Sequence, residues 1–175
     1  MTCGRGASIV CEQDLVHFLF VNVEAKMSYR FFGWEQANVS SISSDYPGVC
    51  TPCDLYDALS DLWGPETCAP RMADKWTREN KTLGQCSITA FLAQDIFGGL
   101  VYGIERADGN CHCYNVVGDC VFDLTSEQFG DEKLDYSLQK NSVQSREAHF
   151  AKDEKETRYL KLRAALREKL SRKGN

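Results

Sequence analysis

One cysteine of this chain stands where a thiol could act as a nucleophile. Cys86 opens a stretch in which Ile88 and Phe91 recur at helical spacing and which Gly98 ends, so we expect it at the N-terminus of a helix. Unsatisfied N–H groups and the helix dipole lower the pKa of a thiol there, and the thiolate is the form that attacks. The sequence therefore predicts a nucleophilic Cys86.

A cysteine nucleophile needs a base, and the chain has three histidines: His17, His112 and His149. Strand-like runs at 100–106, 111–117 and 120–124 are separated by turn residues and predict an antiparallel meander. Because His112 is the histidine on one of these strands, we expect it to be the base.

Strand parity suggests a third member of the site. If Gly118 and Asp119 form a two-residue turn, His112 and Asp123 share a face, and the carboxylate can hold the imidazole in the right tautomer. Asn115 is the rival for this role, but in a regular strand it points to the opposite face, and a bulge would reverse the choice. Asp123 could equally cap the turn that follows it.

Acyl attack also needs donors for the oxyanion. The backbone N–H of Cys86 supplies one, and a side-chain amide could supply another. Asn80, six residues before the cysteine, and the adjacent Gln85 are the candidates, and we rank Asn80 slightly higher.

Two further helices are expected around this set. Residues 51–63 carry leucines at helical spacing before Gly64 and Pro65, and the segment from about 153 has an apolar face and a basic last turn. We therefore expect an α+β fold in which N-terminal helices pack on a small antiparallel sheet and an amphipathic helix closes the domain. Residues 46–175 would form this domain, and residues 1–45 an N-terminal extension of uncertain order whose first 26 residues contribute little.

Composition narrows the function classes. The net charge is −5 and the basic residues of the last helix are interleaved with acidic ones, which disfavours a nucleic-acid partner. No apolar run reaches the length of a membrane span, and the N-terminal stretch is a poor export signal, so we expect a cytoplasmic protein. The oligomeric state is left open.

The cysteines are numerous, nine in 175 residues, and their odd number leaves at least one thiol free of intramolecular disulfides. In a reducing compartment most would be small buried hydrophobes. Cys50 and Cys53, or Cys111 and Cys113 with His112, are residue types that could bind zinc. Neighbours on a strand point to opposite faces, however, so Cys111 and His112 could not both bind one ion without distortion. We therefore expect neither a metal nor a cofactor.

Several blocks together resemble the YunG family of uncharacterised bacterial proteins. The resemblance covers roughly residues 51–170, and it rests on Trp76, Asn80, the segment 84–90 around Gly84-Gln85-Cys86, 94–99, 112–115, 123–129 and Arg158-Tyr159. The chain departs from the family in its long N-terminal extension and in the cysteines that flank His112. Neither departure removes a candidate site residue.

The resemblance implies a papain-like or transglutaminase-like core, related to NlpC/P60 proteins, in which a helix-borne cysteine faces a strand-borne histidine and a polar third residue. The expected function is a cysteine hydrolase or acyltransferase that acts on an amide or thioester, such as a small peptide, through a Cys86 acyl intermediate. The alternative is a catalytically inactive module that binds a peptide or small ligand in the same groove.

Overall fold

The computed structural model describes residues 29–173. The first α-helix of this range is α2 (Pro52–Leu59), and it begins after the N-cap residue Thr51. Thr51 and Asp54 form a reciprocal capping box, in which each side chain accepts from the backbone N–H of the other residue. Pro52 occupies the first turn, where a missing N–H costs nothing. The helix ends earlier than the expected residue 63, and a turn carries the chain on to Trp63.

A four-stranded antiparallel sheet follows, and it confirms the predicted meander. β1 (Leu100–Glu105) pairs with β2 (Cys111–Val117), β2 pairs with β3 (Cys120–Phe122), and β4 (Ser142–Val143) completes the order β3-β2-β1-β4. Val117 faces Cys120 across the two-residue turn, and Gly118 there has a φ of 58°, which favours glycine.

β3 is shorter than the predicted run 120–124, and the reason bears on the site. Asp123 leaves the pairing with β2, and its N–H donates instead to the carbonyl of Phe32 at 3.0 Å. The chain then turns into the 3₁₀ helix η3 (Ser126–Phe129). The Asp123 side chain reaches back to His112 of β2.

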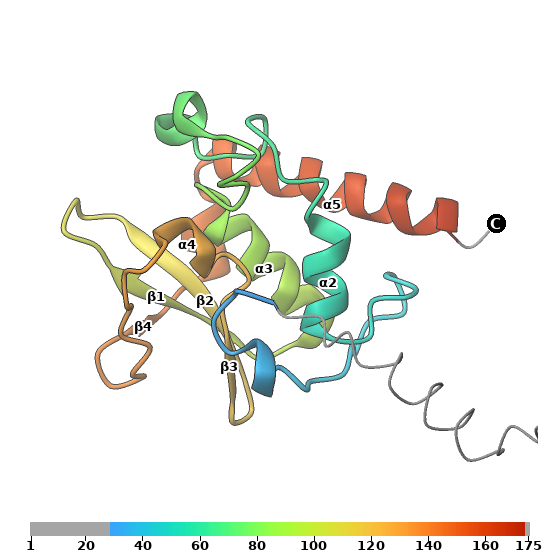
Figure 1. Cartoon of the computed structure of the whole chain (residues 1–175), viewed down its shortest axis with the longest axis horizontal. Helices are drawn as coiled ribbons and strands as arrows, with labels where there is room; N and C mark the ends of the chain where they lie inside the picture. The colour runs from blue at the N-terminus through green and yellow to red at the C-terminus, as the bar shows by residue number, and fades with distance from the viewer. Residues whose placement is uncertain (1–28, 174–175) are drawn as a thin grey trace, which may run out of the picture.

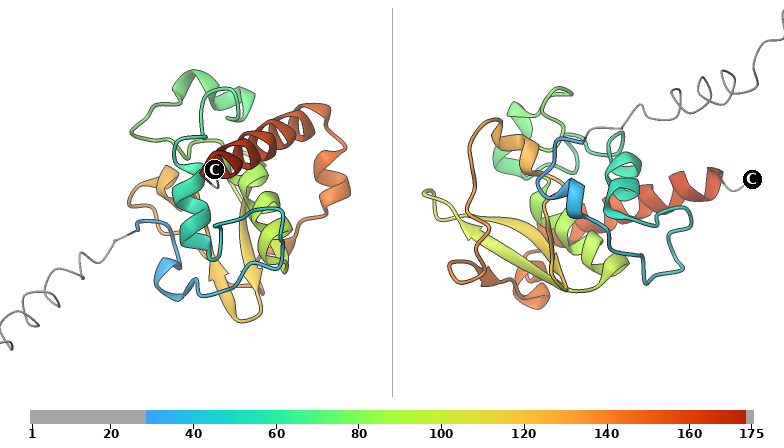
Figure 2. Two further views of the ribbon diagram at one scale, coloured as in Figure 1. Left: turned by 90° about the vertical axis from the view of Figure 1, so that its right-hand side faces the viewer. Right: turned by 60° about the horizontal axis from the view of Figure 1, so that its bottom comes forward.

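The central helix α3 (Cys86–Phe97) packs between the sheet and the long C-terminal helix α5 (Asp153–Lys173), as Figures 1 and 2 show. Its apolar side chains, including Ile88 and Leu92, are fully buried against Leu162 and Leu166 of α5. The expected amphipathic helix therefore covers the domain. Within residues 29–173, no helix is long and apolar enough to cross a membrane.

The chain upstream of residue 46 takes part in this packing. Phe31 is 1% exposed and stacks on Tyr56 of α2 at a ring separation of 5.2 Å. The 3₁₀ helix η1 (Trp34–Gln36) lies against β3. Residues 29–45 thus belong to the packed unit rather than to an extension, whereas the expectation for residues 1–26, and His17 with it, lies outside the described residues.

Five short elements were not expected, because pieces of a few residues carry no periodicity that a sequence pattern can reveal. Besides η1 and β4, they are the 3₁₀ helices η2 (Pro70–Lys75) and η3, and the helix α4 (Arg146–Phe150), which Ser145 caps. As described below, η2, η3 and α4 supply residues to the walls of one cavity.

Candidate functional site

Cys86 is the first residue of α3, and the loop before it is tightly fixed. Gly84 has a φ of 68°, and a Cβ built on it would lie 2.6 Å from the sulfur of Cys68. Cys68 in turn donates its thiol to the Leu83 carbonyl at 3.1 Å. The backbone of Gly84 therefore lies so close to the loop at Cys68 that only glycine fits at this position of the Gly-Gln-Cys block.

His112 lies on β2 and is held by Asp123. Its Nε2 is 2.5 Å from Oδ2 of Asp123, and the two side chains are 2% and 1% exposed. The ring of Phe129 packs edge-on against the imidazole at a centroid distance of 4.6 Å. The pairing of His112 with Asp123 rather than Asn115 agrees with the predicted strand parity.

Both carboxylate oxygens of Asp123 accept hydrogen bonds. Tyr136 donates its hydroxyl to Oδ2 at 2.8 Å, while the backbone N–H and the hydroxyl of Thr125 both donate to Oδ1 at 3.0 Å. The carboxylate thus orients the imidazole with one oxygen and caps the following turn with the other. The two roles that the sequence offered as alternatives coexist.

Cys86 and His112 each shift the pKa of the other toward the charged form. Burial lowers the pKa of His112, but the negative charges of Asp123 and Cys86 outweigh burial and raise it to about 10. Burial raises the pKa of the Cys86 thiol, but the charge and hydrogen bond of His112 and the backbone N–H of Cys113 outweigh it, so the pKa falls below its usual 9.0. Both shifts favour a thiolate beside an imidazolium over a neutral thiol and a neutral imidazole.

Nδ1 of His112 is the nitrogen left for the thiol. Within the described part of the chain this buried atom has no partner in hydrogen-bond geometry, and Cys86 raises the pKa of the imidazole chiefly by its negative charge. Because Asp123 occupies Nε2, the imidazole carries its transferable proton on the side of Cys86.

The pair opens on a cavity of about 860 Å³. Cys86 and Ser87 line it from the start of α3, His112 from β2 and Phe129 from η3. The remaining wall comes from η2, from the loop between β1 and β2, from α4 and from the first turns of α5. A cavity of this size is typical of a site for a small molecule or a few residues of a peptide.

The two predicted oxyanion amides are not part of this cavity, which corrects the sequence-based expectation. Gln85 is fully buried and donates Nε2 to the Gly64 carbonyl at 2.9 Å, because it is the N-cap residue of α3 and faces the loop behind the helix. Asn80 lines a separate cavity of about 1070 Å³. What lies beside the sulfur instead is the start of α3, whose first N–H groups have no intrahelical acceptor.

Asn115 is also placed away from His112. Its Nδ2 donates to the carbonyl of Ala90 in α3 at 2.8 Å, so it joins the sheet to the helix. Sequence reasoning missed Tyr136 and Gln128, which serve the site indirectly. Gln128 donates Nε2 to the Thr125 carbonyl and accepts from the Gly84 N–H, and so ties the Asp123 turn to the Cys86 loop. Gln128 lies in the 123–129 block that resembles the YunG family, and this was the sequence signal that could have identified it.

The cysteines of the described range do not gather with other potential ligands. Between residues 29 and 173, no three histidine, cysteine or acidic side chains come together as metal ligands would, and the seven cysteines of that range are free thiols. Cys111 and Cys113 share one face of β2, but Cys111 is exposed at the end of the strand while Cys113 is buried.

The fold and the site define an α+β protein in which a partly buried cysteine and a buried histidine line one cavity, and a buried aspartate holds the histidine from behind. Residues 51–171 match the model of the family described as YunG protein, and the chain belongs to this family. The uncharacterised protein YunG of Bacillus subtilis (strain 168) is 40% identical over 93 residues, which cover 53% of this chain and 76% of that protein. No solved structure matches the chain.

Proposed function

We propose that the protein is a cysteine hydrolase or acyltransferase with a papain-like or transglutaminase-like arrangement, acting on an amide or thioester. The observation that carries this proposal is that Cys86 and His112 line one cavity, that the charge of His112 lowers the pKa of the Cys86 thiol, and that Asp123 binds the other side of the imidazole. Structural cysteines in apolar surroundings have raised pKa values, as Cys113 has, whereas Cys86 has a lowered one.

In the first step the thiolate of Cys86 attacks the carbonyl carbon, and the carbonyl π electrons move onto oxygen. The N–H groups at the start of α3 are the donors for this oxyanion. His112 then gives its proton to the leaving amine or thiol as the carbon–leaving-group bond breaks, which leaves a thioester on Cys86.

In the second step His112, now neutral, takes a proton from water or from another acceptor, which attacks the thioester. Collapse of the second oxyanion releases the acid or the transferred acyl product and returns the thiolate and the imidazolium. Asp123 keeps the imidazole oriented and stabilises its positive charge, and it is a positioning residue. The substrate class that fits is a small peptide or another amide or thioester.

Selective alkylation tests the proposal, with Cys111 as an internal control. Cys86 and Cys111 line the same cavity, but burial and then Glu105 raise the pKa of Cys111. At about pH 6.5 we expect iodoacetamide to modify Cys86 at least about tenfold faster than Cys111, because the lowered pKa gives Cys86 a larger thiolate fraction than Cys111, whose pKa is raised. Peptide mass mapping after brief labelling measures both rates in one sample.

The pH profile sharpens the test. Since the pKa of Cys86 is below 9.0, its labelling should persist as the pH falls below that value and decline only when the thiolate is protonated in acid. If Cys86 reacts no faster than Cys111, or follows the profile of an ordinary thiol, the site is an inactive binding groove and the enzyme proposal is wrong.

A further inference from the structure

The cavity at Cys86 is rich in positive charge, although the chain as a whole carries −5. Five basic side chains line it, against two acidic ones, Asp108 and Glu154; the basic ones are Arg71, Arg106, Lys152, Lys155 and Arg158. A cavity of one sign with low-dielectric walls concentrates ligands of the opposite sign. The charge of the walls therefore carries information about the substrate.

The arginines of the cavity are already paired. Arg71 lies 3.6 Å from Asp108, Arg106 binds Glu132 at 2.7 Å, and Arg158 binds Glu154 at 2.9 Å. The two lysines differ from them. Among residues 29–173, neither Lys152 nor Lys155 has a carboxylate within ion-pair distance, so their charges are available to a ligand.

Lys155 is held in place by a buried histidine. Its Nζ donates to Nδ1 of His149 at 3.3 Å, and His149 is 8% exposed, with its ring against Phe91 and Phe150. Burial and then the charge of Lys155 lower the pKa of His149 to about 4, so the imidazole is neutral and accepts at Nδ1. The ammonium keeps its other N–H bonds for a ligand.

The same arrangement leaves a buried donor without a partner. If Nδ1 accepts from Lys155, the proton of neutral His149 resides on Nε2. Nε2 is buried and has no partner among the described residues. Because a ligand in the cavity does not reach a buried atom, His149 acts on the cavity through Lys155.

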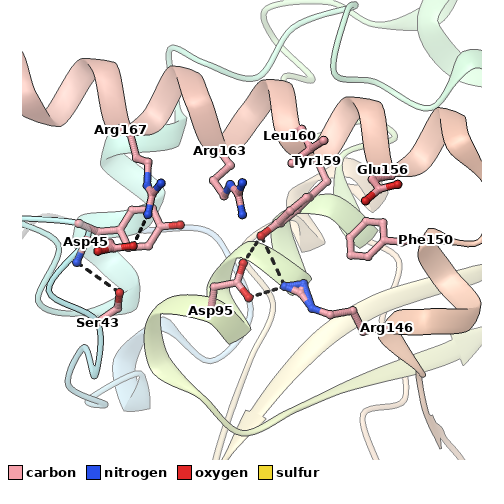
Figure 3. Close-up of a pocket in the computed structure, with 11 residues that line it drawn as sticks. Ser43, Asp45, Asp95, Arg146, Phe150, Glu156, Tyr159, Leu160, Arg163 and Arg167 are labelled. Carbon is pink, nitrogen blue, oxygen red and sulfur yellow. Dashed lines mark hydrogen bonds and ion pairs between the residues drawn. The ribbon is translucent and has the colours of Figure 1, made fainter.

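A second cavity is also lined by basic side chains, but its arginines contact groups of the protein itself. Figure 3 shows Arg146, Arg163 and Arg167 around a cavity of about 470 Å³ between α3, α4 and α5. Arg146 binds Asp95, Arg167 binds Asp45, and Arg163 lies over the Tyr159 ring. The positive charges there are used within the protein, and nothing comparable to the Lys152 and Lys155 pair is left for an anion.

We infer that the substrate of the Cys86 site carries a carboxylate or similar anionic group close to the bond that is cleaved, bound by Lys152 and Lys155, with His149 fixing Lys155. This inference rests on the proposed function, since it assigns the substrate class of the same site. It identifies the chemistry of the ligand, an acidic peptide or acyl compound, from charge and geometry.

Two alkylating reagents of the same size test the inference. Iodoacetate and iodoacetamide share one electrophile, but only the first is an anion, so the ratio of their rates at Cys86 reports the field of the cavity. His112 raises this ratio in any case, and the comparison therefore uses variants. In Lys152→Met with Lys155→Met we expect the ratio to fall about three- to tenfold, and salt to lower it in the wild-type protein.

Lys161→Met is the matched control, because Lys161 lies on α5 outside the cavity and pairs with Glu66. It should leave the ratio unchanged. The iodoacetamide rate reports in each variant that the site is intact. A ratio unaffected by the double substitution, or lowered equally by Lys161→Met, overturns the inference while leaving the proposed function standing. If neither reagent modifies Cys86 in the wild-type protein, the proposed function fails and the inference with it.

Discussion

The chain contains two clusters in which an aspartate joins a base to a neighbouring group, and only one of them is arranged for chemistry. Asp123 binds His112, which acts on the Cys86 thiol. Asp95 of α3 binds Arg146 and accepts the hydroxyl of Tyr159, and so connects α3 with α4 and α5 (Figure 3). Both clusters border cavities, and both fix elements that are far apart in the sequence.

The two clusters differ in the group that the aspartate binds. Arg146 packs its guanidinium against the rings of Phe91, Phe150 and Tyr159, so the second cluster ends in a structural contact and holds no nucleophile beside a base. The first cluster ends in an imidazole with a raised pKa and a thiol with a lowered pKa. A carboxylate positions either kind of site, and the group beyond it decides whether chemistry follows.

The largest expected effect comes from the carboxylate of the reactive cluster. Asp123→Asn removes the charge that keeps His112 protonated, so the pKa of His112 falls and that of the Cys86 thiol rises. Direct repulsion between Asp123 and Cys86 acts the other way but is the smaller contribution. We expect labelling of Cys86 at about pH 6.5 to slow about tenfold or more.

Asn115→Ala is the comparison for that experiment. It removes the bond to the Ala90 carbonyl, costs about 1 kcal/mol of stability and changes the labelling rate little. Circular dichroism excludes unfolding in both variants. A larger loss of reactivity from Asn115→Ala than from Asp123→Asn would show that the amide, and not the carboxylate, completes the site.

The second expected effect separates the two clusters. Asp95→Asn weakens the connection of α3 to α4 and α5, and because Asp95 and Arg146 are about one-third exposed the cost should be about 1 kcal/mol. Thermal or denaturant unfolding measures it. Labelling of Cys86 should stay within about twofold of the wild type, since Asp95 lies in another cavity. A strong loss of labelling would mean that the two clusters are coupled.

The smallest expected effect tests the outer part of the reactive cluster. Tyr136→Phe removes one of the donors to Oδ2 of Asp123, while His112 and Thr125 keep theirs. We expect labelling of Cys86 to change about two- to threefold, because Tyr136 acts on the imidazole only through Asp123, which keeps its bonds to His112 and Thr125. The pH profile of labelling in both proteins measures the shift. A change as large as that of Asp123→Asn would place Tyr136 among the residues that touch the reacting groups.

Local patterns in the sequence determined much of this protein. The helical spacing after Cys86 placed the cysteine at the first residue of α3, and the Gly118-Asp119 turn fixed the register that brings His112 and Asp123 to one side. These are short-range properties, since a helix start and a two-residue hairpin depend on residues a few positions apart. Membership of the YunG family follows from the same blocks.

Tertiary structure decided which side chains share the cavity. Asn80 and Gln85 stand near Cys86 in the sequence but face other loops, whereas Lys152 and Lys155 are distant in the sequence and line its cavity. Tyr136 reaches Asp123 from a segment without regular structure, and Phe31 fills the core from a stretch without periodicity. Such contacts depend on how separate elements pack, and no spacing along one segment encodes where another segment comes to lie.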